Sequence, residues 1–267
     1  MGERIISEIE RNYIISVIEK GKRLDSRGFE DYREIKIETD IIKKAEGSAL
    51  LTMGDTKVLV GVKADIGAPF PDTPDKAVLT VNAEFTAGAA PTFEPGPPDE
   101  QAIELARVVD RGIRESESVD LKKLCLINGK KVWIVFVDVY VLDHSGNLFD
   151  ASELAAMASL IATKIPKATV EDEEVKLRSE REPLPLKNTS VSVTFAKIGN
   201  NILVDPSVEE ENVMECRLTL ATDQEGHIVA AQKGGVGTFT PQEILKATEI
   251  TQRKAAELRE KLPKRPD

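Results

Sequence analysis

The order of strand-like and helix-like patterns along this chain occurs twice, and this repetition limits the fold more than any other feature. In the first half, apolar runs predict strands at 34–38, 41–53, 57–64, 77–86, 124–128 and 132–142, and helical spacing predicts helices at 99–116 and 151–164. The pattern restarts in the second half, with predicted strands at 189–198, 201–204, 214–221 and 227–232 and a helix from 241 to about 261. Two sets of strands, each closed by a helix, predict an α+β protein of two pseudo-equivalent halves.

Segments of different character divide the chain. Residues 1–32 are expected to form an N-terminal helix, which Gly21 stops, and a connector. The first half is expected to span 33–165 and the second 188–262. Between them, 166–187 contains an acidic stretch with few core-type residues, so we expect a connector on the surface.

The overall charge limits the possible partners. Asp and Glu number 46 against 36 Lys and Arg, which gives a formal net charge of −10. This charge argues against a whole-surface positive field for nucleic acid, so any nucleic-acid contact must be local. No apolar run approaches the roughly 18–20 residues that span a bilayer, and the N-terminus has no signal-peptide core, so we expect a cytoplasmic protein without membrane contact.

Several motifs predict no chemistry of their own. Lys233-Gly234-Gly235-Val236-Gly237-Thr238 resembles part of a P-loop, but Thr stands where the loop needs Lys, so a plain glycine turn is expected. Two further sets are the histidines, His144 and His227, and the cysteines, Cys125 and Cys216. Neither set has metal-ligand spacing, and the cysteines are expected to be buried free thiols, so no metal and no cofactor is predicted. The acidic cluster of Asp205 with 209–211 is expected to be a solvated loop.

The helix that Asp99 caps carries a stripe of arginines. Arg107, Arg111 and Arg114 fall within about a 60° arc at 100° per residue, opposite an apolar face. Neighbouring acids at 104, 110 and 115 could neutralise the stripe. Alternatively, the guanidinium groups could clamp phosphates, because Arg binds phosphate oxygens in a planar, bidentate manner. The pattern alone leaves both interpretations open.

Two segments resemble a known family. The connector 21–28 (Gly-Lys-Arg-Leu-Asp-Ser-Arg-Gly) with 31–35 (Asp-Tyr-Arg-Glu-Ile), and the helical segment 103–111, are similar to RNase-PH-type proteins, and within them to the non-catalytic subunit of the archaeal exosome ring. The resemblance implies an RNase PH-like fold and a ring of three heterodimers with a catalytic sister subunit. In such a ring, phosphate attacks the 3′ end of single-stranded RNA, and RNA-binding cap proteins cover one face. It also implies that Arg107 and Arg111 face the RNA path.

Departures from the catalytic pattern concern the active site. Catalytic relatives bind the attacking phosphate with an Arg, and Asn147 stands at that place. They also pair two Asp residues, of which Asp205 matches the first and Glu211 replaces the second, while Arg217 replaces a further acidic residue. We therefore expect no catalytic residues in this chain. An active phosphorolytic exonuclease and a purely structural ring subunit without RNA contact stay open as alternatives.

Overall fold

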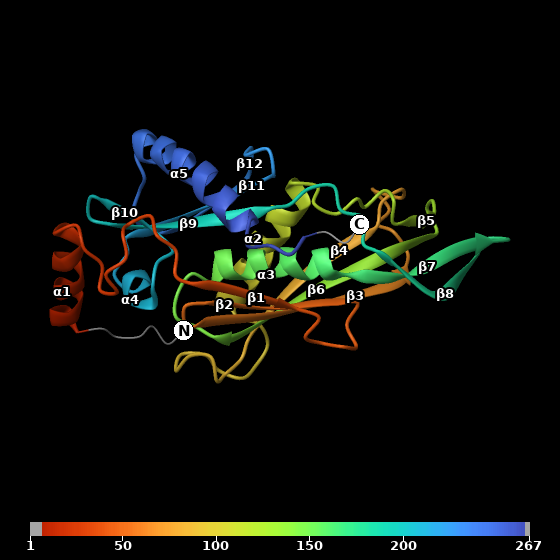
Figure 1. Ribbon diagram of the computed structural model, residues 1–267, viewed down its shortest axis with the longest axis horizontal. Helices are drawn as coiled ribbons and strands as arrows, with labels where there is room; N and C mark the ends of the chain where they lie inside the picture. The colour runs from red at the N-terminus through yellow and green to blue at the C-terminus, as the bar shows by residue number, and fades with distance from the viewer. Residues whose placement is uncertain (1–6, 265–267) are drawn as a thin grey trace.

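The computed structural model describes residues 7–264 and contains two main sheets (Figure 1). The first has the strand order β1-β2-β3-β6-β4, with β5 also paired to β6; β4 runs parallel to β6 and the other pairs are antiparallel. Its strands are β1 (Ile35–Thr39), β2 (Gly47–Met53), β3 (Thr56–Gly67), β4 (Val78–Phe85), β5 (Cys125–Ile127) and β6 (Lys131–Asp143). The second sheet is antiparallel in the order β10-β9-β11-β12, with β9 (Val191–Ile198), β10 (Asn201–Val204), β11 (Cys216–Thr222) and β12 (Ile228–Gly235).

Helices fill the space between the sheets and cover the second one. The helices are α1 (Glu8–Glu19), α2 (Glu100–Glu115), α3 (Leu148–Ala162), α4 (Val208–Glu211) and α5 (Pro241–Arg259). α3 contacts β2 and β3 on one side and β9 on the other, while α2 lies beside it against β4 and β12. α5 packs on β9 and β11. The predicted α+β fold with two sheet-and-helix halves is confirmed.

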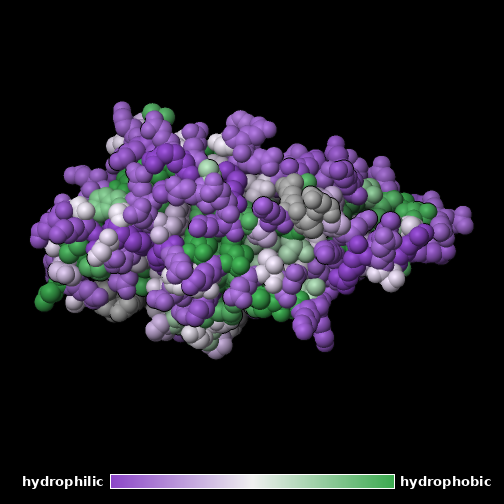
Figure 2. All heavy atoms as spheres, in the orientation of Figure 1, coloured by the Kyte–Doolittle hydropathy of each residue, from purple (hydrophilic) through white to green (hydrophobic). Residues whose placement is uncertain are grey.

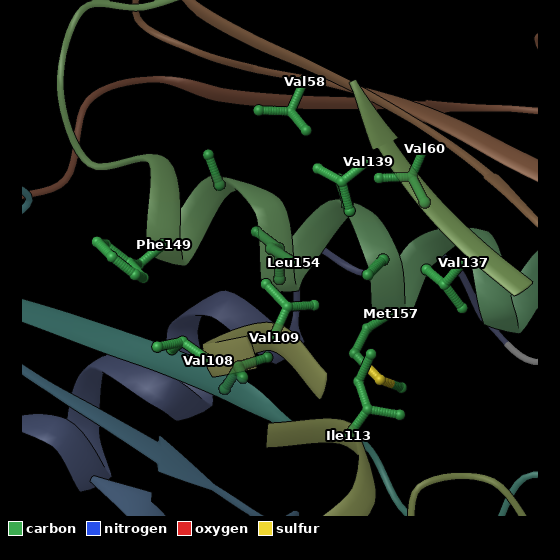
Figure 3. Close-up of a cluster of buried hydrophobic side chains, with 14 of the residues drawn as sticks. Val58, Val60, Val108, Val109, Ile113, Val137, Val139, Phe149, Leu154 and Met157 are labelled. Atoms are coloured by element: carbon green, nitrogen blue, oxygen red, sulfur yellow. The ribbon is translucent and has the colours of Figure 1, made fainter. Parts of the chain in front are cut away.

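α3 is the centre of the hydrophobic core. Its residues from Leu148 to Ile161 are all buried, as expected for a helix that is apolar around its circumference. Leu154 and Met157 extend from it toward Val109 and Ile113 of α2 (Figure 3). The helix begins three residues before the predicted start, because Asn147 adopts a left-handed conformation (φ 51°) and caps it.

α2 is held close to α3 along its buried face. Asp99 caps it by accepting a hydrogen bond from the Ala102 amide at 2.9 Å, as predicted. A Cβ atom at Gly112 would collide with the carboxylate of Glu153 on α3, so glycine is needed for this approach. The opposite face of α2, which carries the arginine stripe, consequently stays outside the core.

The connector predicted at 166–187 is a β-hairpin instead. β7 (Lys164–Glu171) and β8 (Glu174–Pro183) pair antiparallel and project from one end of the molecule (Figure 1). Asp172 and Glu173 both have positive φ, which suits a two-residue hairpin turn. Ala168 and Val170 lie opposite Leu177 and Val175, so the hairpin has a short row of apolar pairs within an acidic sequence. The segment is exposed, as expected, and the face of the molecule in Figure 2 is mostly hydrophilic.

α1 closes the other end of the molecule. Ile14 and Ile18 pack against Ile198, Leu203 and Val213 of the second half. The predicted start of this helix at residue 3 lies outside the described residues. Among the helices of the described chain, none has both the length and the hydrophobicity required to cross a membrane.

Candidate nucleic-acid interface

Two of the predicted arginines form an exposed ridge on α2. Arg107 and Arg111 both line a groove of about 560 Å³ between α2 and the edge strand β4. Both also line a second groove of about 360 Å³, which reaches Gln232 of β12. The two guanidinium groups thus lie one helical turn apart, between two open grooves. We call Arg107 and Arg111 the arginine ridge.

The nearby acids are engaged elsewhere. Glu104 accepts hydrogen bonds from Arg217 at 2.7 Å and from Gln232 at 3.0 Å. Asp110 accepts from Arg114 at 2.6 and 2.9 Å. Within residues 7–264, no ion pair or hydrogen bond involves the side chain of either ridge arginine. Of the three acids that could neutralise the stripe, Glu104 and Asp110 thus pair with other arginines, and Glu115 forms no ion pair with the ridge within the same residues.

Arg114 differs from the ridge. Besides pairing with Asp110, it donates to the carbonyl of Leu79 on β4 at 2.9 Å. The hydrogen bonds that Arg114 donates to Asp110 raise the pKa of Arg114 above its ordinary value. Its guanidinium joins the end of α2 to the edge of the first sheet, and it is less available to an external anion than the two ridge arginines.

A second polar site surrounds Asp205, at the N-terminal end of α3. The Asp205 side chain is fully buried and accepts from Arg33 at 2.7 and 2.9 Å, from Arg27 at 2.7 Å and from Asn147 at 2.9 Å. Burial would raise the pKa of Asp205, but the hydrogen bond and positive charge of Arg33 outweigh it, so the pKa is lowered. Arg33 also donates to the carbonyls of Ser145 and Gly146, which holds its guanidinium beside this carboxylate.

The expectation that the acidic cluster is a solvated loop is wrong. Apart from Asp205, Glu210 is buried and pairs with Arg23, whose Nε lies 2.8 Å from its Oε1. Glu211 accepts from the backbone N–H of Asn147 at 2.8 Å. Burial raises the pKa of Glu211 to about 7. Glu210 of the short helix α4 thus points inward and pairs with an arginine 187 residues away, while Glu211 binds the backbone at the start of α3.

The other motifs have structural surroundings. His144 stacks on Phe93, with ring centroids 5.5 Å apart, and its pKa is lowered by burial and by Arg33. Among the residues with described placement, no three His, Cys, Asp or Glu side chains are grouped to hold a metal ion. Cys216 is buried as expected, whereas Cys125 is only half-buried.

The chain is an α+β protein of two sheet-and-helix halves, in which one half carries the arginine ridge on α2 and the other the buried carboxylate of Asp205. Residues 31–166 match the 3′ exoribonuclease family, domain 1, and residues 188–254 match domain 2 of the same family. The chain belongs to the 3′ exoribonuclease (RNase PH) family.

Individual relatives are similar over nearly the whole chain. The exosome complex component Rrp42 of Thermococcus kodakarensis is 55% identical over 262 residues, which cover 97% of this chain and 96% of that protein. A solved chain of the Archaeoglobus fulgidus exosome with RNA bound to the active site has a TM-score of 0.88 and 50% identity, with 95% of this chain and 98% of that chain covered. A chain described as part of an archaeal exosome core gives a TM-score of 0.85 and 47% identity, with 95% and 96% covered.

Proposed function

We propose that this chain is a catalytically silent subunit of an archaeal-type exosome core ring, and that it holds single-stranded RNA for a catalytic sister subunit. The sister subunit degrades that RNA from its 3′ end with phosphate. Similarity to Rrp42 components and to exosome core chains supports membership of such a ring.

The RNA-holding role rests on the arginine ridge. Arg107 and Arg111 are exposed and project beside two grooves, while Glu104 and Asp110 are held by other partners. Two like charges one turn apart on a helix destabilise it by a few tenths of a kcal/mol, and an anion between them removes that cost. Phosphate groups fit this role because guanidinium groups bind their oxygens in pairs. Arg114 is the weaker candidate, since Asp110 and Leu79 already bind it.

Catalytic silence is supported by the Asp205 site. Asn147 contributes no charge to an attacking phosphate, and its amide is bonded to Asp205 and to Asp150 at 2.9 Å each. Asp205 itself is neutralised by Arg33 and Arg27. A carboxylate with this many internal partners is poorly placed to serve as an acid, a base or a metal ligand.

Assembly is expected to involve both ends of the molecule. Ile9 and Tyr13 of α1 are 83% and 60% exposed, and Leu177 of the projecting hairpin is 53% exposed. Exposed apolar side chains of this size are typical of surfaces that another subunit covers. We expect three copies to alternate with three sister subunits, RNA-binding cap proteins to bind one face of the ring, and the complex to be cytoplasmic.

The test uses the ring reconstituted with its sister subunit. Arg107→Ala with Arg111→Ala should leave a particle of about six chains by light scattering, yet weaken RNA binding and flatten the plot of log affinity against log salt by about 0.7 for each lost phosphate contact. Replacement by Lys should restore part of the affinity, because charge remains without the bidentate geometry. Arg253→Ala, at an exposed arginine of α5, is the matched control. Unchanged RNA binding of the double variant across the salt series would favour the purely structural role.

A further inference from the structure

Arg217 is a buried cation that reaches the helix of the arginine ridge from the second sheet. It lies on β11, with its guanidinium carbon 4.0 Å from the centroid of the Phe149 ring. Its Nη2 donates to Oε1 of Glu104 at 2.7 Å, and its side chain is only 13% exposed. Stacking on one side and the ion pair on the other fix this guanidinium in place.

The position of Glu104 gives this contact its importance. Glu104 precedes Arg107 by three residues on α2, a spacing at which opposite charges pair on a helix surface. It lines the same groove as Arg107 and Arg111. Yet its carboxylate is bound to Arg217, with a further hydrogen bond from Gln232, and pairs with neither ridge arginine. A released carboxylate could turn to Arg107 and compete there with an external anion.

Gly234 leaves the space that Arg217 needs. In the pairing of β11 with β12, Arg217 lies opposite Gly234. A Cβ atom at Gly234 would stand 2.7 Å from Nη2 of Arg217, the atom that donates to Glu104. The φ angle of Gly234 is not in the left-handed region, so a side chain at this position would displace the Arg217 guanidinium without straining the backbone. This explains one glycine of the motif at 233–238 without a bound nucleotide.

We propose that Arg217 is a positioning residue that holds Glu104 away from the arginine ridge and so keeps Arg107 and Arg111 free for RNA phosphates. The inference rests on the proposed function and deepens it. Arg217 acts through Glu104 and makes no contact with RNA itself. Gly234 contributes to the same positioning, because it leaves the space in which the Arg217 guanidinium lies.

The experiment uses the reconstituted ring and labelled single-stranded RNA. Arg217→Met keeps the apolar stem over Phe149 and removes the charge. Exposed ion pairs contribute about 0.2–1 kcal/mol, so a released Glu104 should weaken RNA binding about 1.4- to fivefold. The apparent KM for RNA should rise with kcat unchanged, because the sister subunit performs the chemistry. Gly234→Ala changes no charge and should weaken binding in the same direction.

Rescue variants distinguish positioning from net charge. Arg217→Met with Glu104→Gln should bind RNA like wild type, because the competing carboxylate is gone. Arg217→Met with Glu100→Gln has the same net charge and alters an acid lining the same groove, but it leaves Glu104 free, so it should not be rescued. Equal rescue by both would overturn the proposal in favour of a general charge effect. Wild-type RNA affinity of both Arg217→Met and Gly234→Ala would also overturn the proposal. Failure of the proposed function is distinguished from this result, because it would appear as unchanged RNA binding by the ring with Arg107→Ala and Arg111→Ala.

Discussion

Removal of Arg33 should destabilise the chain far more than removal of an exposed arginine. The side chain of Arg33 is 10% exposed and makes two hydrogen bonds, at 2.7 and 2.9 Å, to the fully buried carboxylate of Asp205. Breaking a buried ion pair by deleting one partner costs about 3–5 kcal/mol, and the lower end of that range is expected here because Arg27 still pairs with Asp205. Arg33→Met should therefore lower the free energy of unfolding by about that amount at pH 7, measured by urea unfolding of the purified chain. Arg253→Met, which breaks the exposed pair with Glu30, should cost at most about 1 kcal/mol.

The response to pH and to a second substitution tests the cause. In the wild type the pKa of Asp205 is lowered, so its stabilising contribution is present above the ordinary value of 3.8 and is lost as pH falls through the folded-state pKa. Without the hydrogen bonds and charge of Arg33, burial weighs more and the pKa of Asp205 should rise in the variant, while Arg27 still opposes the rise. The difference between wild type and Arg33→Met should thus shrink from pH 7 toward pH 4. Arg33→Met with Asp205→Asn should be less destabilised than Arg33→Met alone. A double variant as unstable as the sum of its single variants would refute the buried-charge argument.

Two further predictions concern other buried groups. Burial raises the pKa of Glu153 to about 7 from an ordinary 4.5, so Glu153 favours the folded state fully below about pH 4.5 and loses that contribution as pH rises to about 7. Glu153→Gln should accordingly gain in Tm relative to wild type between pH 4.5 and 7, and a pH-independent difference would contradict this. The isolated chain should release no nucleoside diphosphates from RNA with phosphate and Mg²⁺. Asn147→Arg should not restore the reaction, because Asp205 stays paired with Arg33. A release of nucleoside diphosphates that is abolished by Asp205→Ala would show that the chain is an active enzyme.

Local signals in the sequence were sufficient for α2 but not for the hairpin. Asp99 and the apolar spacing after it identify the start and the buried face of α2, because a cap and a helical period act over a few residues. The hairpin depends on cross-strand pairs such as Val170 with Val175, in a segment where charged residues dominate the composition. Its turn is formed by Asp172 and Glu173, and it lacks the glycine that would have indicated a hairpin turn in the sequence.

The Asp205 site shows why the acidic cluster was predicted wrongly. The partners of Asp205 lie 172 and 178 residues away, at Arg33 and Arg27. Sequence spacing carries no information on such pairs, so each acidic residue, taken alone, was predicted to be exposed to solvent. The same holds for Arg217 and Glu104, which are separated by 113 residues. The stripe on α2 could be predicted, but which of its arginines stay free depends on these distant contacts.

The distribution of arginines between the interior and the ridge favours recognition of the RNA backbone over recognition of bases. Arg23, Arg33 and Arg217 are each bound to a carboxylate of this chain, so they neutralise internal charge. Arg107 and Arg111 keep their donors for an external anion on a chain whose formal net charge is −10. Because most of the surface should then repel RNA, we expect binding to be concentrated at the ridge and to fall steeply as salt screens it. Phosphate contacts fix the position of a strand without reading its sequence, which is what an exonuclease ring needs if it must advance along any RNA.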